Sequence, residues 1–412
     1  MIELTAGPWG NGGVCACRQA DGPVVLVSGA IPGERVLAQV TRRTRSYWLA
    51  RVAAVLEPSP DRVEPAWPEG AALGAADWLH LAPAAARAAK GEVAVGLLRH
   101  ALGSDADGAG PGVGAGVGAR GLGDGADPPL GVPLEVEALG DGAALGWRTK
   151  SELAVDDAGR AGMFQTGSHR FEALAAMPLA TPEIQALGLF DRSWPAGARL
   201  TALAPSAGPA FWVFGGARTS RRRREAVTAA GRTHHYELDA RGFWQIHRLG
   251  PQTLAEAVLA VLQPAPGQVV WDLYAGAGLF TLPLAAAGAR VAAVEGSRQA
   301  AKDLRANARR SGLELLGVET QAVAKALRAG LPGPGPDAAL LDPPRAGAGR
   351  AVIEAVAAAR PARVAYLACE PAALARDLRL LAAGGYALTA LRAFDLFPGT
   401  HHIEILALAE RA

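Results

Sequence analysis

The sequence has few cysteines, few lysines and no long apolar stretch, and each shortage excludes a class of protein. Its three cysteines, Cys15, Cys17 and Cys369, cannot form a disulfide framework, which fits the reducing cytoplasm. No run approaches the ~20 apolar residues that a membrane-spanning helix needs. The first residues, Met1 to Leu4, lack a basic region followed by an apolar stretch, so we expect no signal peptide. We therefore expect a cytoplasmic protein with no membrane partner.

The sequence also has little excess charge of either sign. Its formal net charge is only +2 over 412 residues, so binding to nucleic acid would depend on local patches. Lysine occurs only at positions 90, 150, 302 and 325, and arginine supplies most of the positive charge. Arginine suits paired hydrogen bonds to phosphate, although the same excess could equally reflect a bias of the genome. The length indicates two or three domains.

Residues 1–57 contain short strand-like runs separated by glycine turns, a pattern that predicts a small OB-like β-barrel. Arginines at 42, 43 and 45 lie beside Tyr47 and Trp48. Basic and aromatic side chains together suit phosphate contact and base stacking. The alternative is a solvated hairpin whose aromatic rings pack into the barrel, and the sequence leaves both open.

Residues 58–240 predict an α/β middle domain. We expect a helix over residues 82–102 and strands over 132–139 and 146–155. Residues 103–132 consist mostly of glycine, alanine, aspartate and proline, too little apolar surface to drive ordering. We therefore expect a flexible insertion there.

Two further features of the middle domain concern a helix and a basic run. Gly167 to Arg170 is expected to open a helical stretch. Arg221 to Arg224 form an uninterrupted basic run. Such a run is either a solvated loop or an arm that contacts RNA, and both alternatives stay open.

Residues 241–412 alternate apolar strands with amphipathic helices, which predicts a doubly wound α/β sheet that binds ligands at the carboxyl ends of its strands. The expected strands are 269–273, 290–295, 338–342, 364–368, 387–394 and 403–409, and the expected helices are 297–311, 348–359 and 371–383.

A glycine turn follows the first of these strands. Asp272 to Gly278 has the pattern Asp-Leu-Tyr-Ala-Gly-Ala-Gly, and glycine lets the backbone approach a ligand closely. Thr281 stands where a dinucleotide motif would have its third glycine, which disfavours that class. Glu295 and Asp342 end two further strands, and an acid at the first of these places can bind ribose hydroxyls. Together these features resemble S-adenosyl-L-methionine-dependent methyltransferases.

Cys369 lies between an apolar strand, Tyr366 to Ala368, and a helix that begins at Pro371. A helix N-terminus stabilises negative charge, so this position favours a thiolate. The alternative is an inert core cysteine, because cysteine is among the most buried residue types.

With Cys369 included, the chain resembles the RNA uracil-5-methyltransferases, in particular the 23S ribosomal-RNA branch that carries an N-terminal TRAM domain. In the C-terminal region the resemblance is carried by Phe243 to Ile246, Asp342 to Gly347, Tyr366 to Pro371 followed by Leu374 to Leu378, Asp395 to Pro398 and His402 to Glu404. In the N-terminal region it is carried by Gly33 and Glu34 after Pro32 and by Pro58 to Pro65. The resemblance implies that residues 1–57 are the TRAM barrel, 58–240 an RNA-recognition domain and 241–412 the methyltransferase domain.

The resemblance also implies roles for individual residues. Cys369 would be the nucleophile that attacks carbon 6 of uracil, and Glu404 the proton acceptor at carbon 5. The cofactor S-adenosyl-L-methionine would be held by Gln245, Tyr274, Gly276, Glu295 and Asp342. The partner would be RNA, ribosomal rather than transfer RNA, bound by a monomer. Two adjacent histidines, His401 and His402, are poor evidence for a metal, so no metal site is expected.

Three departures from the family pattern qualify these expectations. Where many members hold an iron–sulfur cluster with four cysteines, this chain has Trp67, Leu73, Ala76 and Met177, so we expect no cluster. The acid often found after the third strand is absent near Gln321. Glu370 replaces an asparagine and would raise the pKa of Cys369 if it faced the sulfur, so we expect it to point away.

Alternatives remain. The chain could modify transfer RNA instead, or it could be a non-catalytic RNA-binding assembly factor that keeps the fold, against which the intact Cys369 and Glu404 argue. A methyltransferase acting on amino groups is disfavoured, because those enzymes place an aromatic residue where this chain has Arg345.

Overall fold

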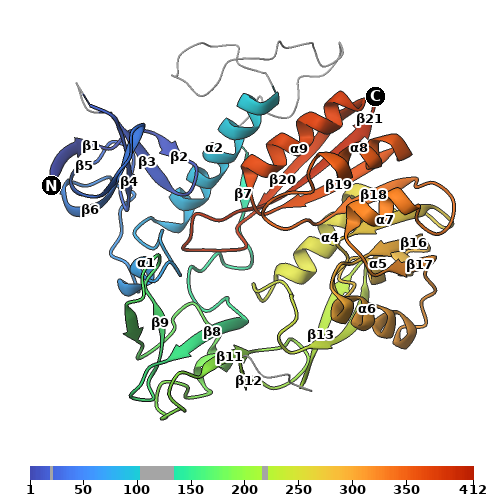
Figure 1. The fold of residues 1–412 in the computed structure, drawn as a ribbon, viewed down its shortest axis with the longest axis horizontal. Coiled ribbons are helices and arrows are strands. Elements are labelled where there is room, and N and C mark those ends of the chain that lie inside the picture. Colours follow the sequence, from blue (N-terminus) through green and yellow to red (C-terminus); the bar gives the residue numbers. More distant parts are fainter. Residues whose placement is uncertain (19–21, 103–133, 216–220) are drawn as a thin grey trace.

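The computed structural model describes residues 1–18, 22–102, 134–215 and 221–412. The expected insertion at 103–132 lies outside these residues. Within them, no helix is both long and apolar enough to span a bilayer. Figure 1 shows the N-terminal sheet on one side of helix α2 (Pro83–Leu102) and the C-terminal sheet on the other.

The N-terminal sheet has six strands in the order β1-β5-β6-β4-β3-β2. Alternate residues point inward, so both cysteines of β3, Cys15 and Cys17, are fully buried. The end strands β1 and β2 are consecutive on the chain, so one N-terminal segment forms both edges and the sheet curls upon itself. The strands are β1 (Ile2–Thr5), β2 (Trp9–Gly10), β3 (Val14–Cys17), β4 (Val24–Ser28), β5 (Arg35–Arg43) and β6 (Tyr47–Glu57).

A second sheet follows, with five antiparallel strands in the order β10-β9-β8-β11-β12. It packs against the short helices α1 (Glu69–Ala72) and α3 (Pro182–Gln185). The helical stretch expected to open at Gly167 is wrong. Gly167 has a φ of 68° in a turn, and the chain continues as a strand that pairs with β9. The strands are β8 (Lys150–Val155), β9 (Ala161–Phe164), β10 (Phe171–Ala173), β11 (Arg199–Leu203) and β12 (Phe211–Phe214).

The C-terminal sheet has eight strands in the order β17-β16-β15-β18-β19-β21-β20-β7. The first five are parallel, whereas β21 runs antiparallel to both neighbours. The doubly wound α/β sheet predicted for this region is confirmed. Its strands are β7 (Val136–Glu137), β15 (Val269–Leu273), β16 (Arg290–Val294), β17 (Gly317–Glu319), β18 (Ala338–Leu341), β19 (Arg363–Ala368), β20 (Tyr386–Phe394) and β21 (Glu404–Arg411).

Helices cover both faces of this sheet, which explains why every residue of β15 is buried. One face packs against α2, α7, α8 and α9, and the other against α4, α5 and a two-stranded hairpin. The elements not yet bounded are α4 (Gly250–Leu262), α5 (Thr281–Ala286), α6 (Arg298–Arg310), α7 (Val323–Ala329), α8 (Arg350–Ala359), α9 (Pro371–Ala383), β13 (Arg222–Ala229) and β14 (Arg232–Asp239).

Three elements from before residue 241 belong to this core. Ala94 and Leu98 of α2 lie in it, β7 adds a strand parallel to β20, and the β13–β14 hairpin contributes Val227 and Tyr236. The core of the C-terminal sheet therefore extends across the expected domain border at 240.

The arginine run does not form the loop that was one of the two expectations. Arg222 to Arg224 begin β13, which pairs with β14. Arg223 is 2% exposed and donates to the carbonyl of Gly242 at 3.1 Å. Arg222 donates to Asp303 at 2.6 Å. Of the four arginines, only Arg221 and Arg224 are exposed.

Candidate active site

A cleft of about 970 Å³ opens at the carboxyl ends of β15, β16, β18 and β19. All seven residues singled out from the sequence line it. They are Gln245, Tyr274, Gly276, Glu295, Asp342, Cys369 and Glu404. The cleft lies where open α/β sheets bind their ligands.

The strand register explains why residues from separate strands meet here. Leu273 pairs with Val294 on one side and with Leu341 on the other, so the next residues, Tyr274, Glu295 and Asp342, lie side by side. In the same way, Ala368 of β19 pairs with Ile405 of antiparallel β21. The residues one step further, Cys369 and Glu404, therefore face each other across the two strands.

The turn after β15 has the backbone conformation that its glycines allow. Gly276 and Gly278 have φ angles of 56° and 98°, and Tyr274 adopts the left-handed region as well, at 70°. A Cβ atom added to Gly276 would meet nothing within 4 Å, so the turn leaves open space above it. Glu295 accepts hydrogen bonds from the backbone N–H of Gly276 at 2.8 Å and of Ser297 at 2.6 Å. These bonds fix the glutamate at the rim of the turn.

The floor of the cleft is acidic through Asp342, which lines it, and Asp272 is buried in the adjoining strand β15. Asp272 is fully buried, bonds to the hydroxyl of Thr281 through one oxygen and leaves the other oxygen without a hydrogen bond. Burial raises the pKa of Asp272 to about 7. Burial and then the charge of Asp272 raise the pKa of Asp342 to about 7. A cation bound above this floor would therefore be stabilised.

Cys369 is half-buried between β19 and α9, as the sequence indicates. The expectation that this position lowers its pKa is wrong for the protein alone. Burial, followed by the nearby carboxyl of Glu404, raises the pKa of Cys369 to about 11, and the Arg345 guanidinium opposes the shift. The helix N-terminus is therefore outweighed by burial and by the carboxyl group.

Glu370, which was expected to point away from the sulfur, contacts a residue of the N-terminal sheet. Its carboxylate lies 3.5 Å from the Nδ2 atom of Asn11, in the turn between β2 and β3. An N-terminal residue thus contacts the segment next to Cys369.

Glu404 begins β21 and is only 4% exposed. Burial and then repulsion from Asp342 raise the pKa of Glu404 well above its usual value. Because both pKa values are raised, the pair holds a proton more readily than two free carboxyls do. A positive charge placed in the cleft would favour release of that proton and make Glu404 a base.

Two residues beside this pair had no role assigned from the sequence. Nε2 of His402 lies 3.2 Å from a guanidinium nitrogen of Arg345, and both line the cleft. Burial and then the charge of His401 lower the pKa of His402 to about 4, so it is neutral and can accept a bond from Arg345. The sequence could have indicated both residues, because each lies in a motif that carries the family resemblance.

The segment between β14 and α4 forms the opposite wall. It carries Gln245, which is 7% exposed, together with Phe243 of the same motif, and it adds Arg241, to which the sequence assigned no role. Arg241 lines the cleft, and its Nε atom is buried without a hydrogen bond. Phe243 is 73% exposed at the rim. The signal for Arg241 was its position just before this motif.

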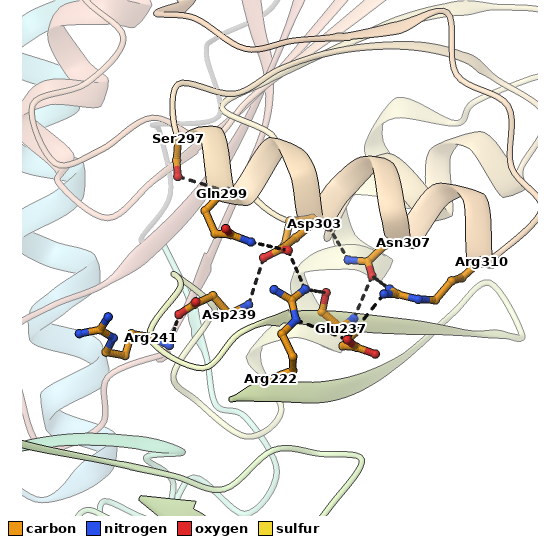
Figure 2. A network of polar contacts seen from close by, with 11 residues as sticks. Arg222, Glu237, Asp239, Arg241, Ser297, Gln299, Asp303, Asn307 and Arg310 are labelled. Atoms are coloured by element: carbon orange, nitrogen blue, oxygen red, sulfur yellow. Dashed lines mark hydrogen bonds and ion pairs between the residues drawn. The ribbon is translucent and has the colours of Figure 1, made fainter. Parts of the chain in front are cut away.

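A polar network holds this wall against helix α6 (Figure 2). Asp303 of α6 accepts bonds from Arg222 of β13 at 2.6 Å and from the backbone N–H of Asp239 at 3.0 Å. Asn307, one turn further, accepts from the backbone N–H of Glu237 at 2.9 Å. The hairpin is therefore fixed to the helix that follows Glu295.

The four positions that correspond to cluster ligands do not suit a metal cluster. Trp67, Leu73, Ala76 and Met177 lie in one hydrophobic core cluster, each at most 6% exposed. Their apolar side chains replace the thiolates that such a cluster needs. No group of three or more His, Cys, Asp or Glu residues with a metal-binding arrangement occurs in the described ranges.

Comparison with known proteins places these features in a family. Residues 243–381 match the family described as "Precorrin methyltransferase domain". The chain is 34% identical to a protein of Streptomyces avermitilis described as an uncharacterized RNA methyltransferase, over 100% of this chain and 98% of the relative. It is 33% identical to a 23S rRNA (uracil(1939)-C(5))-methyltransferase of Alkalilimnicola ehrlichii, over 95% of this chain and 92% of the relative.

A solved structure shares the whole fold. The tRNA (uracil-54, C5)-methyltransferase of Pyrococcus abyssi, in complex with S-adenosyl-L-homocysteine, aligns over 98% of this chain and 99% of its own, with a TM-score of 0.67. At 16% sequence identity, this likeness shows the fold alone. The relatives matched over nearly their full length show more, and this chain belongs to the family of RNA methyltransferases.

Proposed function

We propose that this protein transfers a methyl group from S-adenosyl-L-methionine to carbon 5 of a uridine in RNA, 23S ribosomal RNA rather than transfer RNA. The observation that carries the proposal is the pairing of Cys369 with Glu404 across β19 and β21, in one cleft with the glycine turn. The 33% identity to a 23S rRNA uracil-C5 methyltransferase supports both the base and the RNA.

The cleft suits the proposed cofactor. The open space above Gly276, the fixed carboxylate of Glu295 and the acidic floor offer a surface for an adenosyl group that carries a positive charge. Tyr274 and Gln245 complete this part of the cleft. When bound, the cofactor would supply an electrophilic methyl group and a positive charge, and it would leave as a neutral thioether when its methyl–sulfur bond breaks.

Cys369 and Glu404 then divide the chemistry between them. The thiolate of Cys369 adds to carbon 6 of uracil, and the electron pair of the double bond makes carbon 5 nucleophilic enough to take the methyl group. Glu404, as a carboxylate, removes the proton from carbon 5. The electron pair of that C–H bond restores the double bond, and the carbon–sulfur bond breaks to release the thiolate.

The high pKa of Cys369 gives Arg345 a role in this scheme. Its guanidinium is a positive charge that stabilises the thiolate, and His402 holds it within the cleft. Because a stacked base cannot reach a cleft of this kind, the target uridine must lie in a loop or be flipped out of its helix.

Three lesser assignments accompany the proposal. Residues 1–57 act as a TRAM-like RNA-binding barrel, with residues 58–240 as the RNA-recognition region and 241–412 as the methyltransferase domain, whose core also takes in α2, β7 and the β13–β14 hairpin. The protein works as a monomer in the cytoplasm. It holds no iron–sulfur cluster, because Trp67 and its three neighbours fill that place, and stoichiometric iron and sulfide in the pure protein would contradict this.

The experiment is a comparison of RNA from wild-type and deletion cells, with 5-methyluridine mapped by mass spectrometry. Loss of one or more 5-methyluridines from 23S RNA is the expected result. Loss confined to transfer RNA would identify that substrate instead. An unchanged pattern, combined with no turnover of the pure protein on RNA, would favour a non-catalytic assembly factor.

A further inference from the structure

The N-terminal sheet reaches the catalytic end of the cleft through one turn. Residues 11–13, which we call the N-terminal turn, connect β2 to β3. Asn11, Gly12 and Gly13 line a narrow crevice together with Cys369 and Glu370. The turn is separated from Cys369 by more than 350 positions in the sequence, yet it touches the residue that follows the thiol.

Gly13 fits this place because it has no side chain. A Cβ atom on Gly13 would lie 2.6 Å from the Cβ atom of His401 and 2.8 Å from the indole nitrogen of Trp78. That same nitrogen donates a hydrogen bond to the carbonyl oxygen of Gly13 at 3.1 Å, and Trp78 is 1% exposed. The turn is thus tied to Trp78 and pressed against His401.

His401 belongs to the segment 395–403, which connects β20 to β21 and which we call the base loop. Asp77 holds His401 twice, through Nδ1 at 2.6 Å and through the backbone N–H at 3.2 Å. The backbone N–H of Trp78 donates to the carbonyl of Gly399 at 2.9 Å. Trp78, which contacts Gly13, and the adjacent Asp77 therefore bind the middle of the base loop.

Lys90 of α2 holds the start of the same loop. Its ammonium group, fully buried, donates to Asp395 at 2.5 Å and to the carbonyl of Phe397 at 3.2 Å. The base loop is thus fixed at its start and middle by residues from the first quarter of the chain. Its other end leads through His402 directly to Glu404.

We propose that the N-terminal turn, seated through Gly13 on His401 and Trp78, positions the base loop and so sets the place of Glu404 and His402 beside Cys369. Gly13 and Trp78 are positioning residues, since the contacts that connect them to Glu404 run through His401. This inference rests on the proposed function, because it assigns Glu404 the role of base. It makes the N-terminal sheet part of the methyl-transfer step rather than a module that only adds affinity for RNA.

The N-terminal turn supplies its own matched control. Gly12 and Gly13 have φ angles of 80° and 75°, so alanine is strained equally at both. A Cβ atom on Gly12, however, would meet nothing within 4 Å. Of the two substitutions, only Gly13→Ala would place a methyl group in steric conflict with His401 of the base loop.

The experiment measures kcat, the KM for RNA and the dissociation constant of S-adenosyl-L-homocysteine for wild type, Gly12→Ala and Gly13→Ala. Because displacement of a catalytic group by about 1 Å can cost about 10²-fold in rate, we expect that loss of kcat in Gly13→Ala. KM and cofactor binding should stay within about twofold of wild type in both variants, and kcat should do so in Gly12→Ala. Equal kcat in two folded variants would overturn the proposal.

Trp78→Phe keeps the experiment decisive if Gly13→Ala does not fold. It removes the hydrogen bond to the Gly13 carbonyl without straining the turn, and we expect kcat to fall about fivefold at unchanged KM. Wild-type kcat in folded Trp78→Phe would overturn the proposal. A failure of the proposed function has a different signature, because wild type itself would then form no 5-methyluridine.

Discussion

The cleft has a proposed cofactor end, at Tyr274, Gly276 and Glu295, and a proposed catalytic end, at Cys369 and Glu404, and the two are assembled in different ways. At the cofactor end, Tyr274, Gly276 and Glu295 come from consecutive strand–turn units, and Glu295 bonds directly to the turn that it faces. At the catalytic end, Cys369 and Glu404 meet through strand register, and the loop before Glu404 is held by residues 13 to 90. The cofactor end depends on local sequence, whereas the catalytic end depends on contacts across the whole chain.

The ends also differ in how charge is balanced. Beside the cofactor end, the carboxylate of Asp303 is paired with Arg222 and bonded to two further donors (Figure 2). At the catalytic end, burial and mutual repulsion raise the pKa values of Asp342, Cys369 and Glu404. The first arrangement gives rigidity. In the second, the raised pKa values favour the protonated groups, and a bound cation would lower those pKa values.

The largest effect is expected at the nucleophile. Cys369→Ala should reduce methyl transfer by about 10⁴-fold or more, because the covalent route is lost while the binding surfaces remain. Methyl transfer from radiolabelled S-adenosyl-L-methionine to RNA measures this. Cys17→Ala, in the core of the N-terminal sheet, is the control and should stay active. Substantial activity in Cys369→Ala would contradict the assignment of Cys369 as the nucleophile.

Glu404→Gln should lower turnover by about 10²- to 10³-fold, the usual contribution of a general base. The adduct between Cys369 and RNA should still form, and it should accumulate because its release needs the proton at carbon 5 to leave. Denaturing gels that resolve protein–RNA adducts would show this. Glu410→Gln, at the far end of β21, is the matched control. Loss of both turnover and adduct would assign Glu404 a structural role.

The pH dependence of Cys369 tests the electrostatic difference between the ends. Since the pKa is raised to about 11, the thiolate fraction of the free enzyme should rise about tenfold per pH unit between pH 7.5 and 9.5. The rate of alkylation by iodoacetamide, followed on the Cys369 peptide by mass spectrometry, should rise about 10²-fold over that range. Arg345→Met should slow the reaction further at each pH. A plateau near pH 7 would show that the helix N-terminus prevails.

The smallest effect is expected at the cofactor end. Glu295→Gln keeps the size of the side chain but weakens the hydrogen bonds that an ionised carboxylate accepts, so the dissociation constant of the cofactor should rise about tenfold. Isothermal titration with S-adenosyl-L-homocysteine measures it, and kcat at saturating cofactor should change little. Glu314→Gln, exposed in the same domain, is the control. If Glu295→Gln lowered kcat and left the dissociation constant of the cofactor unchanged, the two ends of the cleft would not act independently.

The sequence predicted what local patterns determine. Alternating strands and helices after residue 241 gave the methyltransferase fold, and each motif residue at a strand end lies in the cleft. The Cys369 strand and helix also lie where expected, because Pro371 and the apolar run before it specify both locally.

Contacts between distant segments could not be predicted in this way. The sequence around Lys90 does not predict that its ammonium group binds Asp395. The sequence around Gly13 does not predict that this glycine contacts His401. The prediction that the pKa of Cys369 is lowered was wrong for the same reason, since burial and Glu404 outweigh the local helix dipole. At Gly167, where a helical stretch was expected to begin, the chain instead makes a turn and continues into β10, whose pairing with the distant β9 the local sequence does not specify.

The most direct measurement of the central claim is the mass of the protein after incubation with S-adenosyl-L-methionine and a 23S RNA fragment that contains 5-fluorouridine. Fluorine at carbon 5 cannot leave as the proton does, so the methylated base stays bound to the enzyme. The account predicts a covalent complex whose mass equals protein plus RNA plus one methyl group, with the RNA attached to the peptide that contains Cys369. A protein that methylates unsubstituted RNA but forms no such complex, or that forms it through another residue, would contradict the account.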